Sequence, residues 1–328
     1  MKAIKLTLTC LSLFFLLACA ASENISLETL PPPGVEVQVA SATPEASATP
    51  FVLELSDALG RNVQIIGEPR RVISLSSFIT STFFSAGAEH LLVGRDSLSL
   101  YPPEAEDIPS LGDMFSEFDA VQFIPLDADL VLADETYPIE SILNIEALGV
   151  PIFIFPTAVE LEDIYSNISL IGSLTNQQEL FDLTIEDFQQ RLASVGQVIG
   201  DTSPRPRVFY ELEASDPENP WTYGAGTILD EILELAGGEN AALNLEGTWV
   251  QFPLAELQTI NPEFILLADA AYGIDLATLQ TRPGWNSIEA VLEGQVLAFD
   301  ETIISKPGPR IIEMIESLAA AFHPNLFP

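Results

Sequence analysis

Length, composition and charge narrow the classes of protein to which this chain can belong. Its 328 residues suffice for two ordinary domains, and 48% of them are hydrophobic, which is ample for buried cores. A formal charge of −36 repels nucleic acid and anionic lipid, so we expect no nucleic-acid partner. The same acidity is also typical of a highly soluble protein or of a salty habitat, and the sequence leaves these readings open.

The N-terminal segment has the pattern of a bacterial lipoprotein signal peptide. Lys2 and Lys5 precede the run "LTLTCLSLFFLLA", which is apolar but short for a membrane span and leads into "LLAC" at Cys19. We expect residues 1–18 to be removed and Cys19 to carry a lipid. The alternative is an ordinary signal peptide cleaved near "ACA". Cys10 lies inside the apolar run, so no internal disulfide is expected.

Residues 19–50 are predicted to form a tether. They are rich in Ala, Ser, Thr, Pro and Glu and show no helical spacing of apolar residues. A lipid anchor followed by such a tether places the remainder of the chain outside the cytoplasm, near the cell membrane but not within it.

From residue 51 onwards, short strands alternate with helices. The stretch "FVLELSDALGRNVQII" has two apolar runs around a glycine-containing turn and predicts a β-hairpin. Strands are then expected at residues 71–76, 91–95, 128–134 and 151–156, and helices at 80–88, 139–149 and 159–175. This alternation is typical of βαβ units with a parallel sheet.

A long helix separates this first half from a similar second half. Between Asn176 and Ile199 the apolar residues recur at helical spacing, over a length of about 35 Å. After "DTSPRPR" the pattern restarts, with strands at 207–213, 263–269 and 295–300 and helices at 227–238, 254–260 and 309–322. The predicted fold is α/β, with an N-terminal lobe (51–175) and a C-terminal lobe (203–328) joined by a single helix (176–202).

No pattern in the sequence indicates catalysis. The two histidines, His90 and His323, have no cysteine or carboxylate at metal-ligand spacing. The "GAG" at 224–226 lacks the further glycine and lysine of a phosphate loop, and no G-x-S-x-G elbow is present. We therefore expect no metal site, no cofactor and no enzymatic activity.

Several motifs, taken in order, resemble a known family. They are "RRVISLSSFITSTFFSAGAEHLLVGR", "YPPEAEDIPSLGD", "NPEFILLAD", "RPGWNSIEAVLEGQVLAFD" and "SKPGPRI". Across residues 51–326 they resemble bacterial ABC-transporter binding proteins for cobalamin and iron chelates. The resemblance implies a class III periplasmic-binding-protein fold, with two α/β lobes on a rigid helix and a ligand between them. It also implies a monomer that delivers its ligand to a membrane permease powered by a separate ATPase.

The ligand class is narrowed by the motifs and by composition. The C-terminal motifs resemble the cobalamin type most. Anionic catecholate siderophores favour clefts with several basic residues, which are scarce here, whereas a nearly neutral corrinoid needs aromatic walls and a few polar anchors. A ferric siderophore or haem remains the alternative. An anchored hydrolase or adhesion module is disfavoured by the missing nucleophile.

Candidate site residues come from loops that follow strands and from the resemblance. The expected ligand-binding residues are Ser76, Ser77, Phe78, Met114, Phe115, Trp221, Tyr223, Trp249, Phe252 and Lys306. Lys306 lies where relatives often carry an arginine facing the cleft, and the nearby Pro307 and Pro309 stiffen the loop. Relatives usually dock on the permease through one glutamate per lobe. Val121 and Ala255 stand at those positions, so the neighbouring Asp119 and Glu256 are the predicted docking acids.

Overall fold

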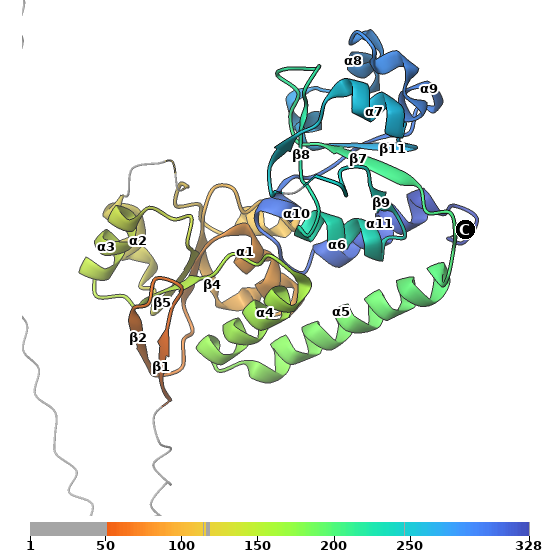
Figure 1. Cartoon of the computed structure of the whole chain (residues 1–328). Helices are drawn as coiled ribbons and strands as arrows, with labels where there is room; N and C mark the ends of the chain where they lie inside the picture. The colour runs from red at the N-terminus through yellow and green to blue at the C-terminus, as the bar shows by residue number, and fades with distance from the viewer. Residues whose placement is uncertain (1–50, 114, 116–118, 246, 328) are drawn as a thin grey trace, which may run out of the picture. The chain divides into compact units, whose positions relative to one another are not determined.

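The computed structural model describes residues 51–113, 115, 119–245 and 247–327 (Figure 1). The predicted signal peptide, the predicted acylation at Cys19 and the tether lie outside the described residues. Within the described part of the chain, no helix is both long enough and apolar enough to cross a membrane.

The described chain begins with the predicted hairpin. Strand β1 (Val52–Ser56) pairs antiparallel with β2 (Asn62–Ile66) around a turn in which Gly60 has a positive φ of 73°. Asp57 tightens this turn, because its carboxylate accepts hydrogen bonds from the backbone N–H groups of Leu59 and Arg61. The short polar turn residues thus join two strands whose apolar side chains alternate.

The N-terminal lobe is built on a four-stranded parallel sheet. Its strands are β3 (Val72–Leu75), β4 (Leu92–Arg95), β5 (Leu130–Asp134) and β6 (Ile152–Phe155), in the order β4-β3-β5-β6. The connecting helices are α1 (Ser77–Ser85), α2 (Ala120–Phe123), α3 (Ile139–Ala147) and α4 (Leu161–Thr175). Three-residue to five-residue 3-10 turns occupy Glu89–Leu91, Pro103–Asp107 and Ile124–Leu126.

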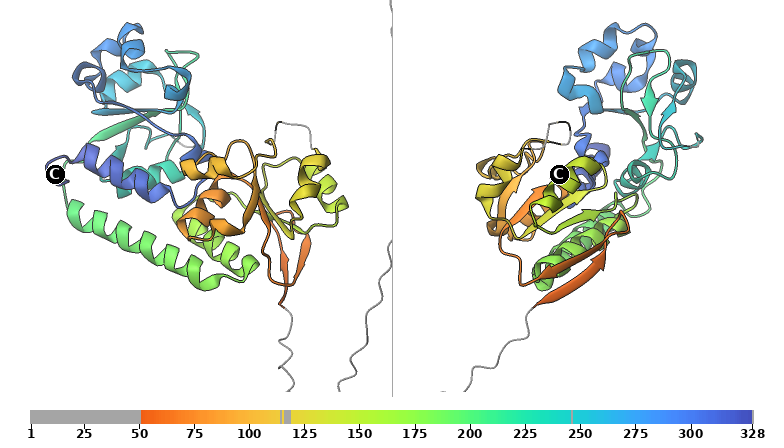
Figure 2. Two further views of the ribbon diagram at one scale, coloured as in Figure 1. Left: turned by 180° about the vertical axis from the view of Figure 1, so that it is seen from behind. Right: turned by 90° about the vertical axis from the view of Figure 1, so that its left-hand side faces the viewer.

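A single long helix connects the two sheets. Helix α5 (Gln178–Ile199) has 22 residues and therefore spans roughly 33 Å at 1.5 Å per residue. Figures 1 and 2 show that it runs beside α4 and then beside α11 (Ile311–Phe322). Its buried face carries Phe181, Phe188 and Val195, which follow the helical spacing predicted from the sequence.

The C-terminal lobe repeats the strand order of the first sheet. Its parallel strands are β7 (Arg207–Glu211), β9 (Glu239–Asn240), β11 (Phe264–Leu267) and β12 (Val296–Ala298), in the order β12-β11-β7-β9. In both sheets the second strand in sequence lies on one side of the first, and the third and fourth lie on the other. A separate ribbon pairs β8 (Trp221–Thr222) with β10 (Val250–Gln251) in antiparallel register.

Helices cover the second sheet as they cover the first. They are α6 (Ile228–Leu235), α7 (Leu254–Ile260), α8 (Leu276–Thr281), α9 (Glu289–Glu293), α10 (Thr302–Ser305) and α11. Short 3-10 turns occupy Ala268–Tyr272 and Trp285–Ser287. The ribbon, strand β9 and the helices α2, α8, α9 and α10 were not predicted from the sequence.

Both sheets are buried on their two faces. In β11, Leu266 belongs to the same core as α5, whereas Ile265 and Leu267 belong to a second core around Trp285. In the first sheet, Leu132 and Val131 divide in the same way between two cores. Successive side chains of a strand point to opposite faces, so continuous apolar strands indicate helices on both sides. The predicted α/β class with parallel sheets is confirmed.

Candidate functional site

The strand order defines one favoured ligand-binding position in each lobe. In open parallel sheets, ligands bind beyond the carboxyl ends of the strands, at the point where the chain switches direction across the sheet. That point lies between β3 and β5 in the first lobe and between β7 and β11 in the second. The residues that follow these four strands therefore make up the candidate site.

At the first switch point, β3 leads directly into α1. Ser76 is the buried N-cap residue of this helix, Ser77 is its first residue and Phe78 its second. Phe78 packs edge to face on Phe155 at the end of β6, with ring centroids 5.6 Å apart. The predicted serines thus lie at the strand end, while most of the Phe78 ring belongs to the core.

Asp134 ends β5 beside these residues, and sequence reasoning did not single it out. Its carboxylate accepts a hydrogen bond from the backbone N–H of Thr136 at 2.9 Å and another from the hydroxyl of that residue. Burial raises the pKa of Asp134, but the charge and hydrogen bonds of Lys306, together with hydrogen bonds from Ser76 and Thr136, more than offset this, and the pKa lies below its ordinary value. A carboxylate directly after a continuous apolar strand was the signal that could have identified it.

The ribbon of the C-terminal lobe carries the predicted aromatic residues. Trp221 lies opposite Gln251 in the β8–β10 pairing, and Trp249 immediately precedes β10. Trp249 is 67% exposed, whereas Tyr223 is buried and stacks at an angle on Tyr210, with centroids 5.6 Å apart. The ribbon therefore presents the largely exposed indole of Trp249, which is also hydrogen-bonded to Tyr223.

Phe252 was expected to line the ligand site, but it lies in the hydrophobic core of the C-terminal lobe. It is 1% exposed and packs edge to face on Phe209 of β7, with ring centroids 5.6 Å apart. Its place in the core around Trp285 leaves almost no surface for a ligand in this structure. In the N-terminal lobe, Met114 lies outside the described residues, and Phe115 is 84% exposed.

Lys306 lies before the last helix, as the sequence suggested, but its ammonium group is already bound by protein atoms. Its ammonium group donates to Asp134 Oδ1 at 2.8 Å, to Asp134 Oδ2 at 2.7 Å and to Thr136 Oγ1 at 2.5 Å. The Lys306 side chain is 18% exposed and that of Asp134 is 3% exposed. The lysine is therefore engaged by the N-terminal lobe in this structure and is not a free cation facing a ligand.

The second switch point holds a buried cluster that sequence reasoning also missed. Glu211 ends β7 and forms an ion pair of 2.7 Å with Arg282, and Asp269 follows β11 next to it. Burial raises the pKa of Glu211 to about 7, although Arg282 lowers it, and burial also raises the pKa of Asp269. The Arg282 guanidinium in turn lies over the Trp285 ring, 4.9 Å from its centroid.

Among the described residues, each basic side chain near the carboxyl ends of the strands is bonded to another group of the protein. Their partners are Asp134 for Lys306, Glu211 for Arg282, Asp300 for Arg310, and the carbonyl oxygens of Asp96 and Ala105 for Arg95. An anionic ligand would have to displace one of these partners. The candidate site is therefore unsuited to a ligand that needs several arginine or lysine contacts.

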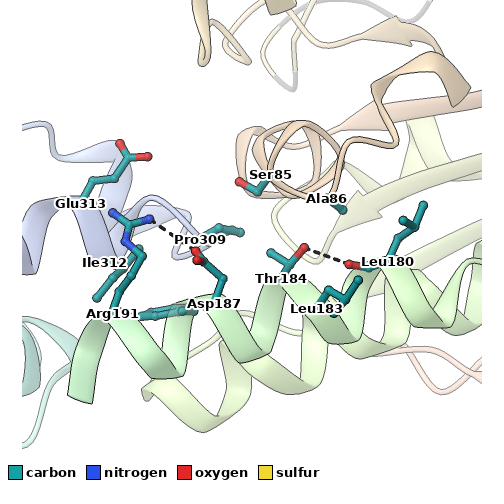
Figure 3. Close-up of a pocket in the computed structure, with 11 residues that line it drawn as sticks. Ser85, Ala86, Leu180, Leu183, Thr184, Asp187, Arg191, Pro309, Ile312 and Glu313 are labelled. Atoms are coloured by element: carbon teal, nitrogen blue, oxygen red, sulfur yellow. Dashed lines mark hydrogen bonds and ion pairs between the residues drawn. The ribbon is translucent and has the colours of Figure 1, made fainter. Parts of the chain in front are cut away.

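Cavities also occur away from the strand ends. One of about 380 Å³ lies between the end of α1, helix α5 and the start of α11 (Figure 3). At its rim Arg191 pairs with Asp187 at 3.8 Å, and Arg191 also binds Glu316 of α11 at 2.5 Å. Its lining consists mostly of helix side chains and includes none of the predicted site residues. Among the described residues, no group of three or more His, Cys, Asp or Glu side chains could hold a metal ion.

The predicted docking acids lie at the surface of each lobe. Asp119 is exposed and precedes α2, where its carboxylate accepts a hydrogen bond from the backbone N–H of Val121 at 2.9 Å. Glu256 is exposed in the first turn of α7. Their role in docking remains a prediction.

Comparison with known proteins identifies the family. Residues 72–302, most of the chain, match the model of the periplasmic binding protein family. The chain belongs to this family. The resemblance inferred from the motifs is thus confirmed, and because the family binds solutes rather than converting them, the expectation of a non-enzymatic protein is confirmed as well.

Two curated relatives match this periplasmic binding protein over most of its length. One is the uncharacterised ABC transporter substrate-binding lipoprotein YvrC of Bacillus subtilis (strain 168), 27% identical over 280 residues, which cover 84% of this chain and 87% of that protein. The other is the cobalamin-binding protein of Halobacterium salinarum, 27% identical over 284 residues, covering 84% and 75% respectively.

A solved structure supports the fold. The periplasmic haem-binding protein RhuT from Roseiflexus sp. RS-1, in its apo form, superimposes with a TM-score of 0.68 at 24% sequence identity, covering 79% of this chain and 100% of that one. The two-lobed α/β architecture is therefore common to both proteins.

Proposed function

We propose that this periplasmic binding protein is the substrate-binding lipoprotein of an ABC importer and captures a corrinoid between its lobes. The relatives named above support the transport role, since one is a substrate-binding lipoprotein and another binds cobalamin. In this proposal the predicted acylated Cys19 holds the protein at the outer side of the cell membrane. Asp119 and Glu256 guide its docking on the permease.

The corrinoid assignment rests on one observation. Among the described residues, every basic side chain near the carboxyl ends of the strands is already bonded to a protein carboxylate or carbonyl group. Haem presents two carboxylates and a catecholate siderophore presents several anionic oxygens, and both classes need free cations. A corrinoid is nearly neutral and offers a broad apolar face with peripheral amides. The exposed indole of Trp249 can pack on that face, and the half-buried Ser77 at the start of α1 can hydrogen-bond an amide.

Calorimetry and visible spectroscopy test this assignment. The purified protein is titrated with cyanocobalamin, with haem and with a ferric catecholate, and the coloured corrinoid is expected to co-purify with it. Trp249→Ala should weaken corrinoid binding by about thirtyfold, which corresponds to about 2 kcal/mol for an aromatic anchor. Leu292→Ala is a matched control, because Leu292 on α9 is equally exposed at 66% but lies away from the strand ends.

Two results would contradict the proposal. If the wild type ignores cyanocobalamin and binds haem or the ferric catecholate, the ligand class is wrong. If Trp249→Ala binds cyanocobalamin as tightly as the wild type does, the ligand lies elsewhere.

A further inference from the structure

The segment between α10 and α11 belongs to the C-terminal lobe and contacts the N-terminal lobe. We call residues 305–310, "SKPGPR", the strap. It follows β12 and α10 and leads into α11, which packs against α5 and α6. The strap is thus a second physical link between the two lobes, in addition to helix α5.

The first contact of the strap is the ion pair of Lys306. Its three hydrogen bonds all end on Asp134 and Thr136, which belong to the N-terminal lobe at the switch point beside β3. Asp134 is almost fully buried, so its charge is stabilised chiefly by this one ammonium group. Removing either partner would leave a buried or half-buried charge without its counter-ion.

The second contact is close packing on helix α1. A side chain at position 308 would place its Cβ 3.0 Å from Cβ and 3.3 Å from Cα of Phe78, so Gly308 allows the strap to lie directly on the first turn of α1. Pro307 and Pro309 flank this glycine and restrict the backbone on both sides. The approach of the strap is therefore fixed by backbone geometry as well as by charge.

The third contact lies at the start of α11. The guanidinium of Arg310 lies over the Tyr101 ring, 4.0 Å from its centroid, and Arg310 pairs with Asp300 at 2.6 Å. The Tyr101 hydroxyl donates to Glu313 Oε2 at 2.7 Å. Tyr101 follows β4 in the N-terminal lobe, so this end of the strap is also held across the lobes.

We propose that the strap is a clasp between the lobes, and that Lys306 is a positioning residue that acts through Asp134 instead of touching the ligand. The clasp holds the two switch points at a fixed spacing before a ligand arrives. A preformed site avoids the cost of ordering on binding, so the clasp raises ligand affinity. The affinity part of this inference rests on the proposed function, whereas the clasp itself does not.

Hydrogen exchange of the ligand-free protein tests the clasp independently of any ligand. In Lys306→Met, which keeps the length of the side chain but not its charge, the amides of residues 135–137 and of residues 306, 308 and 310 should exchange at least tenfold faster. Lys306→Arg should retain near wild-type exchange. Arg205→Met is the matched control, because it removes an exposed cation of the same lobe. Unchanged exchange in Lys306→Met would overturn the proposal.

A double-mutant cycle with cyanocobalamin distinguishes positioning from ligand contact. If both residues act through one ion pair, Lys306→Met, Asp134→Asn and the double variant should each lose affinity by a similar factor, about tenfold. If Lys306 contacts the ligand directly, the two losses should multiply to about a hundredfold, and the positioning role is wrong. Should Lys306→Met fail to fold, Asp134→Asn alone is compared with Arg205→Met by hydrogen exchange. If cyanocobalamin does not bind at all, the proposed ligand fails while the exchange result still decides the clasp.

Discussion

The stability of the C-terminal lobe should depend on the protonation of Glu211. This carboxyl group is buried at the end of β7, next to Asp269 and Arg282, and its pKa is raised to about 7 from an ordinary value of 4.5. The folded state therefore binds the Glu211 proton more tightly than the unfolded state does. The stabilisation is complete below pH 4.5 and is lost as the pH rises through about 7.

The size of this effect follows from the difference between the two pKa values. The difference between a pKa of about 7 and the ordinary value of 4.5 corresponds to about 3–4 kcal/mol. A large share of the stability of an ordinary domain, about 5–15 kcal/mol, is thus linked to one proton. Glu211→Gln cannot titrate and keeps a side chain of the same shape. Between pH 4.5 and 8, its unfolding free energy should therefore change less than that of the wild type, by up to this amount.

Urea unfolding followed by tryptophan fluorescence measures the difference. All three tryptophans, Trp221, Trp249 and Trp285, lie in the C-terminal lobe, so the signal reports that lobe. Unfolding curves of the wild type and Glu211→Gln are compared between pH 4.5 and 8.

The control for this comparison is Glu293→Gln. It removes the same charge from the exposed end of α9 and accounts for the general repulsion in so acidic a chain. If the wild type and Glu211→Gln show parallel dependence on pH, the assignment of a raised pKa to Glu211 is wrong. If Glu293→Gln flattens the curve as much as Glu211→Gln does, the effect is general and the argument from burial fails.

Three further predictions concern single features of the chain. Phe252→Ala should lower the unfolding free energy of the C-terminal lobe by about 3–5 kcal/mol, because it empties a packed core position; an unchanged urea midpoint would place Phe252 outside the core. Mass spectrometry of the mature protein should find an acylated N-terminal Cys19, and an unmodified N-terminus at Ala20 or beyond would exclude the lipid anchor. Charge reversal at both Asp119 and Glu256 should slow association with the permease without changing ligand affinity, and an unchanged association rate would mean that docking uses other residues.

Local sequence patterns were sufficient to predict the regular elements. Continuous apolar runs such as "VISL" and "LVLAD" became β3 and β5, and the helical spacing from Asn176 to Ile199 became α5, which begins at Gln178. These elements depend on the period of apolar residues, which is a property of neighbours in the chain. The short pieces α2, α8, α9, α10 and β9 and the β8–β10 ribbon have no such period and were missed.

The environment of individual side chains was set by tertiary packing instead. Trp249 and Phe252 are three residues apart and were predicted to play the same part, yet one is largely exposed and the other packs on Phe209. Lys306 and Asp134 are 172 positions apart, and nothing near either residue in the sequence indicates the other. The sequence by itself determined that Lys306 stands directly before Pro307 near the C-terminus. Only the approach of the two lobes gave that lysine its partner, because a buried carboxylate is stable only where folding brings a counter-ion within hydrogen-bonding distance.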